Sequence, residues 1–420
     1  MKKTTLLSAV LLLSAAVFAQ VQTETTSLQQ LEEKVQDNTN TLSKLKNLKV
    51  SGYIQTQYQW GEEDASLKVG TGNEHPDQAF NRIGVRRGRI KFAYSQGIAS
   101  GVFQLDLTEK GIGFKDAYLQ IKDPWTGRSS LKAGIFDRTF GNEISYSSSR
   151  RESPERSTLF QTLFPDERDV GAALTLQTAK TSPLHFLKLE AGLFSGNGIK
   201  RDTDSKKDFI GHLSASDQIG KNATWGLGVS YYHGSVYQGT ENVFTFNQNT
   251  FELHSEASNK GAFSKREYVG IDAQFTLNTA AGKTQLRGEY LFGTQPGENG
   301  NSKSPNASTL SDKDTYVRNF DGGYAILIQD LGKSNLSAVM KYDWYNPNTK
   351  ISGDAIGLNN TNKGDISYNT LGLGMLWHAN KNIRLQAYYE FVKNETSQNL
   401  TGYETDRKDN TFTLRLQYKF

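Results

Sequence analysis

Apolar and polar residues alternate along most of the chain from residue 49 to the end. In the stretch VRRGRIKFAY, for example, Arg87, Arg89 and Lys91 occupy one parity and apolar residues occupy most of the other. Period-two alternation is the signature of β-strands, in which successive side chains point to opposite faces. The pattern therefore predicts an all-β unit whose strands each have one apolar and one polar face.

The alternating segments are about 9–11 residues long, which is the length that a tilted strand needs to cross a bilayer. Only 36% of the residues are hydrophobic, but a membrane barrel needs an apolar residue only at every second strand position. A soluble sandwich would have to hold all these strands without a linker, and all-β domains of that size are uncommon. We therefore expect a transmembrane β-barrel over residues 49–420.

The links between the alternating segments are short and long in turn. Tight turns are expected near residues 95–100, 123–129, 178–184, 217–223, 278–283, 329–335 and 378–382, with long polar loops between them except near residues 109–113, where the link is short. Short turns on one rim and long loops on the other are typical of outer-membrane barrels. Counting strands between the links gives sixteen antiparallel strands, of which the segment 316–328, with its Gly-Gly pair, has the least clear parity. A barrel of this size leaves an aqueous channel.

The first 48 residues follow different patterns. Residues 1–19 have a basic start, a short apolar core and a small-residue cleavage site, which together predict a secretory signal peptide. Apolar residues then recur at heptad spacing, at Leu28, Val35 and Leu42 and at Leu31 and Leu45, with Asn38 in the same series. This predicts a short periplasmic coiled-coil helix within residues 20–48 that oligomerises; a flexible periplasmic leader is the alternative.

The polar faces of the predicted strands carry charge. A charge that faced lipid near the midplane would cost about 2–4 kcal/mol, so Arg87, Arg89 and Lys91 are expected to face the channel. Counted over all strands, cations on this face outnumber anions modestly. The alternative is that the cations only neutralise carboxylates that line a nonselective pore.

The long loop after the fifth strand is rich in arginine. The segment 137–171 contains Arg138, Arg150, Arg151, Arg156 and Arg168. Long functional loops often fold over a site, and rings of Arg and Lys select anions and phosphate in pores. We therefore expect this loop to enter the barrel and to form an Arg-lined constriction that binds anions.

Several of these stretches together resemble a known family. VRRGRIKFAY, FKDAYLQI, LKAGIFDRTFGNE, the ESPERS and ERDVG pieces, LFSGNG and AVMKYDWYNPN are similar, in this order, to the phosphate-selective porin O and P family. The resemblance implies a trimeric, sixteen-stranded porin of the Gram-negative outer membrane that passes small anions, best known for phosphate and pyrophosphate. It also implies that Arg87, Arg89 and Arg138 are pore cations.

The chain ends in TFTLRLQYKF, an alternating segment with a final aromatic residue. It resembles the terminal strand of bacterial outer-membrane proteins, whose last residue, here Phe420, is read by the barrel-assembly machinery. Together with the signal peptide, this predicts that the protein is exported and inserted among the lipids of the outer membrane.

Other function classes find little support in the composition. The six His are not at metal-ligand spacing, there is no Cys, and no GxSxG nucleophile motif is present. The net charge of +4 is too small to indicate nucleic-acid binding. We therefore expect no enzyme activity, catalytic residue, metal or cofactor. Besides an anion channel, the sequence leaves open a general or other-solute porin and a mainly structural barrel with a periplasmic oligomerisation stalk.

Overall fold

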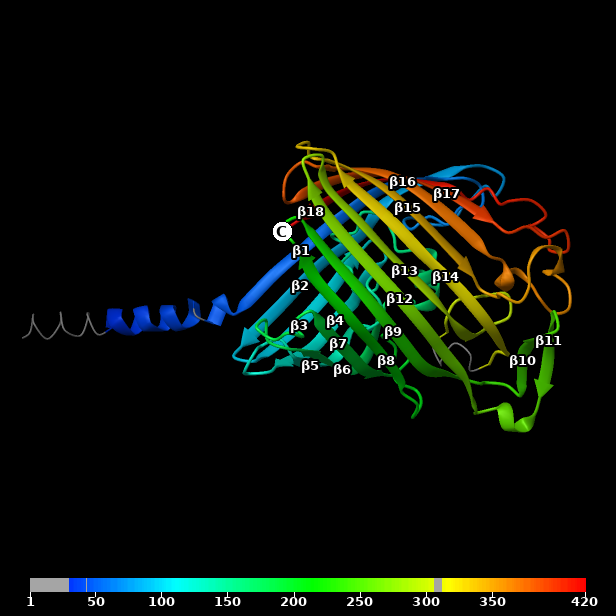
Figure 1. The fold of residues 1–420 in the computed structure, drawn as a ribbon, viewed down its shortest axis with the longest axis horizontal. Helices are drawn as coiled ribbons and strands as arrows, with labels where there is room; N and C mark the ends of the chain where they lie inside the picture. The colour runs from blue at the N-terminus through cyan, green and yellow to red at the C-terminus, as the bar shows by residue number, and fades with distance from the viewer. Residues whose placement is uncertain (1–29, 43, 306–311) are drawn as a thin grey trace, which may run out of the picture.

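Each barrel strand pairs antiparallel with the next one, and the first strand pairs with the last, so the sheet closes on itself (Figure 1). The structure is a computed structural model that describes residues 30–42, 44–305 and 312–420. The predicted signal peptide at residues 1–19 and the first part of the 20–48 segment lie outside the described residues. No helix within the described ranges is long and apolar enough to cross a membrane.

The strands are longer on average than the crossing length requires. Their bounds are β1 Leu48–Gly61, β2 Phe80–Gln96, β3 Ala99–Thr108, β4 Gly111–Lys122, β5 Ser130–Asp137, β6 Arg168–Gln177, β7 Leu187–Phe194, β8 Asp208–Ile219, β9 Ala223–Tyr237, β10 Asn242–Asn247, β11 Thr250–Ser255, β12 Phe263–Thr279, β13 Gly282–Gly297, β14 Thr315–Asp330, β15 Leu336–Asn346, β16 Tyr368–His378, β17 Ile383–Asn394 and β18 Thr411–Lys419.

Sixteen of these described strands form the barrel, as the sequence predicts. The other two, β10 and β11, form a hairpin within the long loop between β9 and β12, and β9 pairs directly with β12. The first residues of β10 also pair with the start of β14. The predicted tight turns all lie on one rim, and the long loops lie on the rim that carries this hairpin (Figure 1).

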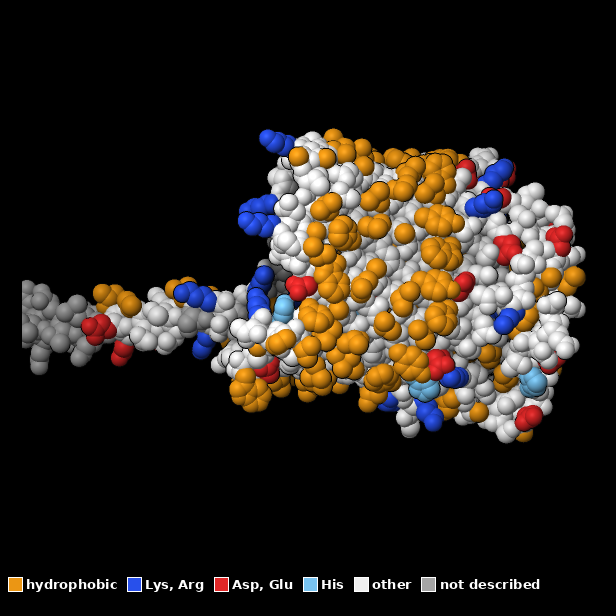
Figure 2. Space-filling view, in the orientation of Figure 1, with side chains coloured by type: hydrophobic (Ala, Val, Ile, Leu, Met, Phe, Trp, Pro, Cys, Tyr) orange, Lys and Arg blue, Asp and Glu red, His pale blue; other side chains and the backbone are white. Residues whose placement is uncertain are grey.

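The predicted parity of the strands holds around the wall. Apolar side chains such as Leu227 and Ile271 are more than half exposed on the outer face, at 56% and 53%. Their neighbours on the other parity are largely covered inside the lumen, as Gln55 and Gln57 of β1 are. Figure 2 shows the outer apolar side chains as a broad band between the two charged rims. Apolar residues thus meet the lipid and polar residues meet the channel.

The strand with unclear parity, β14, is apolar on both faces. Ala325 and Leu327 are exposed on its outer face, whereas Tyr324, Ile326 and Ile328 are buried inside the lumen. The inward residues belong to a hydrophobic cluster in the lumen. The alternation was therefore hard to detect because this part of the lumen is not lined by polar residues.

The first described residues and the C-terminus are at the rim with the short turns. Residues 30–42 and 44–46 are helical, and this helix projects from the barrel near the C-terminus (Figure 1). The apolar heptad residues Leu31, Val35, Leu42 and Leu45 are exposed along it. At the other end of the chain, the backbone of Phe420 exchanges two hydrogen bonds of 3.0 Å with Gly52 of β1. The C-terminal residue therefore completes the seam between the first and last strands.

Candidate functional site

The long segment between β5 and β6, residues 138–167, folds into the barrel and is called the inner loop from here on. It contains a short helix, α2 (Thr158–Leu163), which is visible inside the barrel in Figure 1. Its backbone and side chains bond to strands far around the wall, including Ser148 to Tyr53 of β1, Glu152 to Arg287 of β13, and Glu143 to Lys341 of β15. The inner loop thus crosses the lumen and narrows it.

One side of the inner loop is held by apolar packing. Leu159, Phe160, Leu163 and Phe164 are buried against side chains of the lumen wall from β9, β12, β14 and β15. The ring of Phe164 lies 5.7 Å from that of Tyr268 and 6.0 Å from that of Tyr232. Burial of large aromatic groups is a strong driving force even inside a barrel, because it removes them from channel water.

The entry of the inner loop depends on a glycine. Gly141 has a φ of +56°, and a Cβ there would lie 2.0 Å from Glu289 Oε2. That carboxylate of β13 accepts hydrogen bonds from the backbone N–H groups of Asn142 and Glu143, at 3.0 and 2.5 Å. A side chain at position 141 would be strained by its conformation and would clash with Glu289.

On the opposite side, the inner loop is held by ion pairs centred on Glu155. Its carboxylate accepts hydrogen bonds from Nε and Nη2 of Arg86, each 2.9 Å long. It also accepts hydrogen bonds from Arg87 Nη2, at 2.6 Å, and from Arg415 Nη2, at 2.9 Å. Burial alone would raise the pKa of the Glu155 carboxyl, but the charges of these three arginines hold the pKa well below its ordinary value. Glu155 is therefore an anion at any physiological pH.

Other arginines expected at the site also have carboxylate partners. Arg89 Nε lies 3.3 Å from Asp106, and Arg138 Nε lies 3.1 Å from Asp169. Arg168 Nε lies 2.7 Å from Asp116, and Arg156 is paired with Glu167 and donates to three carbonyl groups of the inner loop. Arg138, Arg156 and Arg168 are buried, so their side chains hold the inner loop and the strands next to it in place, although Arg156 and Arg138 also line cavities beside the loop.

Two arginines of the inner loop have no carboxylate partner among the described residues. Arg150 is exposed, and its guanidinium lies 5.1 Å from the ring of Tyr146. Arg151 is only 3% exposed, and all three of its guanidinium nitrogens lack a hydrogen-bond partner in the described chain. Burial, together with the charges of Arg156 and Arg87, lowers the pKa of Arg151 well below its ordinary value. The positive charge of Arg151 is therefore disfavoured by its buried surroundings.

A cavity of about 240 Å³, called the basin below, lies between the inner loop and strands β2 to β4. Its charged lining residues are the cations Arg86, Arg87, Arg89, Lys115, Arg156 and Lys303 and the anions Asp106, Glu155, Asp166 and Glu167. Neither Lys115 nor Lys303 has an ion-pair partner within 4 Å among the described residues, so the basin carries an excess of positive charge.

Further cavities continue from the basin along the same wall. One of about 260 Å³ shares Arg86, Asp106 and Lys115 with it and adds Lys68 and Lys110. Another, of about 140 Å³, begins at Lys91, two residues beyond Arg89 on the same face of β2. This second cavity shares residues with a vestibule of about 490 Å³ on the side of the short turns. Together they outline a route past the inner loop.

Two cations that line the basin, Arg86 and Lys115, are not predicted to face the lumen by strict alternation, because each lies at a β-bulge. The register between β1 and β2 shifts at Arg86, and that between β3 and β4 shifts at Lys115. Each bulge adds one residue, so Arg86 and Arg87 both face the lumen, as do Lys115 and Asp116. A signal was present: by strict alternation, Arg86 and Lys115 would have faced lipid, where a charge is costly.

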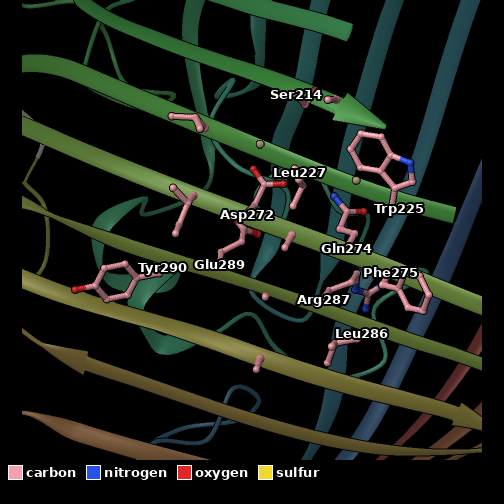
Figure 3. Close-up of a pocket in the computed structure, with 18 of the residues that line it drawn as sticks. Ser214, Trp225, Leu227, Asp272, Gln274, Phe275, Leu286, Arg287, Glu289 and Tyr290 are labelled. Atoms are coloured by element: carbon pink, nitrogen blue, oxygen red, sulfur yellow. The ribbon is translucent and has the colours of Figure 1, made fainter. Parts of the chain in front are cut away.

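The wall opposite the basin shows the two faces of the barrel clearly. In the close-up of Figure 3, Asp272 and Gln274 alternate with Phe275 on β12, and Arg287 and Glu289 alternate with Leu286 and Tyr290 on β13. The apolar members of this set lie beside Trp225 and Leu227 around an outer groove of about 940 Å³. This groove is on the lipid side and is not part of the channel.

Nothing in the described ranges suggests a bound metal: no group of three or more His, Asp or Glu is arranged to hold one there. The chemistry of the lumen is that of guanidinium and ammonium groups next to fewer carboxylates. Such a site can attract, bind and release anions.

Solved structures of outer-membrane proteins are similar to this chain in fold. The chain is similar to OmpF of Salmonella typhi in complex with daunomycin, with 13% identity, a TM-score of 0.53 and coverage of 89% of this chain and 97% of that one. It is similar to an anion-selective porin from Comamonas acidovorans, with 10% identity, a TM-score of 0.52 and coverage of 89% and 99%. The trimer form of OmpT from Vibrio cholerae has 11% identity, a TM-score of 0.51 and the same coverage.

Sequence comparison gives the family itself. No curated protein matches the chain, but the model of the family "Phosphate-selective porin O and P" matches residues 54–297, which is more than half of it. The matched region begins in β1 and includes the inner loop and all described residues that line the basin except Lys303. The chain therefore belongs to the phosphate-selective porin O and P family and is an outer-membrane porin.

Proposed function

We propose that this porin passes small anionic solutes, with phosphate and pyrophosphate among them, through a constriction lined by arginine and lysine between the inner loop and β2–β4. The observation that carries the proposal is the charge of the basin, where six cations face four carboxylates and two of the lysines have no carboxylate partner among the described residues. A cleft lined by one sign of charge between low-dielectric walls concentrates ions of the opposite sign.

The cations of the route are spaced along β2. Arg86, Arg87 and Arg89 line the basin, and Lys91 lines the next cavity. Arginine forks bind two oxygens of an oxyanion at once, and a series of such groups lets an anion pass from one to the next. The remaining predicted cations, Arg138, Arg150, Arg151, Arg156 and Arg168, keep the inner loop in place or add to the positive potential around it.

The assembly is also a proposal. We infer a homotrimer in the outer membrane, supported by the trimer form of the similar OmpT fold, with the helix of residues 30–46 joining its copies as a periplasmic coiled coil. Its exposed apolar stripe would be covered there. Export through a cleaved signal peptide and recognition of Phe420 by the barrel-assembly machinery belong to the same proposal.

The test is the reversal potential of the purified protein in a planar bilayer under a KCl gradient. We expect chloride to be more permeant than potassium, and we expect Lys115→Gln and Lys91→Gln each to lower that preference. Lys221→Gln, at a short turn outside the cavities, is the matched control and should leave it unchanged. A wild-type channel that prefers potassium, or that does not conduct, would contradict the proposal.

Selectivity for phosphate is tested separately. Added inorganic phosphate should reduce the chloride current at millimolar concentration, because it occupies the basin for longer than chloride does. If phosphate reduces the current only in proportion to its share of the anions, the protein is a general anion porin.

A further inference from the structure

The carboxylate of Glu155 sits where a solute anion would bind. It makes a two-oxygen contact with the fork of Arg86 and receives further bonds from Arg87 and Arg415. Its side chain is 8% exposed, and those of Arg87 and Arg415 are 4% and 2% exposed. This bidentate, charge-assisted geometry is the one that guanidinium groups use to bind carboxylate or phosphate. The channel thus supplies one anion of its own to a three-arginine site.

That site opens directly onto the basin. Glu155, Arg86 and Arg87 all line it, and its volume of about 240 Å³ leaves space beside the carboxylate. Arg86 is the most exposed of the three arginines, at 26%, so its guanidinium faces both Glu155 and the open space. An oxyanion in the basin would therefore compete with Glu155 for hydrogen bonds from the guanidinium of Arg86.

The surroundings show that one carboxylate does not neutralise this region. Three guanidinium groups bond to Glu155, and Lys115 and Lys303 line the same basin without a carboxylate within 4 Å among the described residues. Without Glu155, this density of fixed positive charge would bind a multivalent oxyanion tightly. Conduction requires that an ion bind well enough to enter and weakly enough to leave.

We propose that Glu155 is a built-in competitor that sets how tightly the basin binds oxyanions and so how fast they leave it. The ligands concerned are small anions with two adjacent oxygens, of the phosphate and carboxylate class, which share Arg86 and Arg87 with Glu155 while they pass. The inference rests on the proposed anion route and adds to it a residue that determines affinity by its own negative charge.

The experiment compares two charge-removing variants of the inner loop. Glu155→Gln should lower the concentration of inorganic phosphate that halves the single-channel chloride current by about tenfold or more and lengthen the blocked intervals. Glu152→Gln is the matched control, since Glu152 is equally buried, lies three residues away and pairs with Arg287 rather than with the basin arginines. An unchanged or weaker block in Glu155→Gln, or an equal change in both variants, would overturn the proposal.

A second variant covers the case in which Glu155→Gln displaces the inner loop. Arg86→Gln leaves Arg87 and Arg415 to hold Glu155, and it should weaken the phosphate block several-fold. In the double variant with Glu155→Gln, phosphate block should return towards the wild-type value. Phosphate block as tight in the double variant as in Glu155→Gln alone would contradict the competition. A wild-type channel without chloride preference contradicts the proposed function, yet a gain of phosphate block in Glu155→Gln would still support the competitor.

Discussion

Arg415 of the last strand and Glu155 of the inner loop are 260 positions apart in the chain, yet Nη2 of one lies 2.9 Å from Oε1 of the other. The same guanidinium donates to the carbonyl of Pro154 at 2.7 Å and to Gln57 of β1. One side chain thus joins the inner loop to both strands of the barrel seam.

Removal of this contact should loosen the inner loop without unfolding the barrel. Arg415→Gln loses charge-assisted hydrogen bonds, each with a net contribution of about 1.5–3 kcal/mol. We expect faster trypsin cleavage at the exposed Arg150 of the detergent-solubilised protein, with unchanged heat-modifiable migration on a gel. The control is Arg407→Gln, which removes an ion pair with Asp64 in the outer loops and should leave the cleavage rate at Arg150 as it is.

The apolar side of the inner loop should matter as much as the charged side. Phe164 is almost fully buried and lies 5.0 Å from the ring of Phe140. A large-to-small change at such a site costs about 3–5 kcal/mol, so Phe164→Ala should detach α2 from the wall and raise the single-channel conductance. Phe103→Ala, on the lipid face, is the control. Equal conductance in the two variants would show that the loop does not limit the channel.

Adjacent residues of β12 allow a direct test of which face meets lipid. Ala273 is exposed on the outer wall, and Gln274 lines the vestibule. Ala273→Arg should destabilise the barrel in vesicles by about 2–4 kcal/mol, because it places a charge in hydrocarbon. Gln274→Arg should change stability much less, since its charge enters water. Urea unfolding of both variants measures the difference, and equal losses would argue against the assigned faces.

The N-terminal helix should contribute to assembly rather than to the barrel. Leu42 lies on its exposed apolar stripe, so Leu42→Asp should lower the temperature at which trimers separate on a gel, because it places a charge in the proposed coiled-coil seam. Gln36→Glu, outside the heptad apolar positions, should not. Trimers of equal thermal resistance in both variants would indicate that the helix does not hold the copies together.

The pH dependence follows from the lowered pKa of Glu155, on which burial acts against the charges of Arg86, Arg87 and Arg415. A carboxylate with a depressed folded-state pKa contributes stability that is fully present above its unfolded value, about 4.3, and is lost as pH falls through the folded value. The difference in unfolding free energy between the wild-type protein and Glu155→Gln should therefore stay constant from about pH 8 to about pH 5 and shrink only in stronger acid. Urea unfolding of both proteins across this pH range measures that difference. A difference that changes near neutral pH would contradict the pairing of Glu155 with the three arginines.

The barrel could be predicted from the sequence because lipid and channel water impose opposite preferences on alternate residues. The strand number and the alternation of short and long links follow from that pattern alone, and both are confirmed. The family resemblance is confirmed as well. These features are local, since each strand carries its own signal.

The partners inside the lumen could not be predicted in the same way. Nothing local to Glu155 indicates that Arg86, Arg87 and Arg415 converge on it, since that contact depends on closure of the whole sheet. The bulges at Arg86 and Lys115 change parity within a strand, and a strict period of two passes over them. The apolar residues around α2 were assigned to a polar loop, because a hydrophobic core inside a channel violates the expected pattern.

The barrel cannot close before β18 has formed, because β18 is the partner of β1 at the seam. All nine of its paired positions use residues 411–419, so β1 keeps an open edge until the last segment of the chain is in place. Arg415, which anchors the inner loop, is in that same segment. A polypeptide cut short before β18 would therefore have an open edge at β1 and would lack one of the three arginines that bind Glu155.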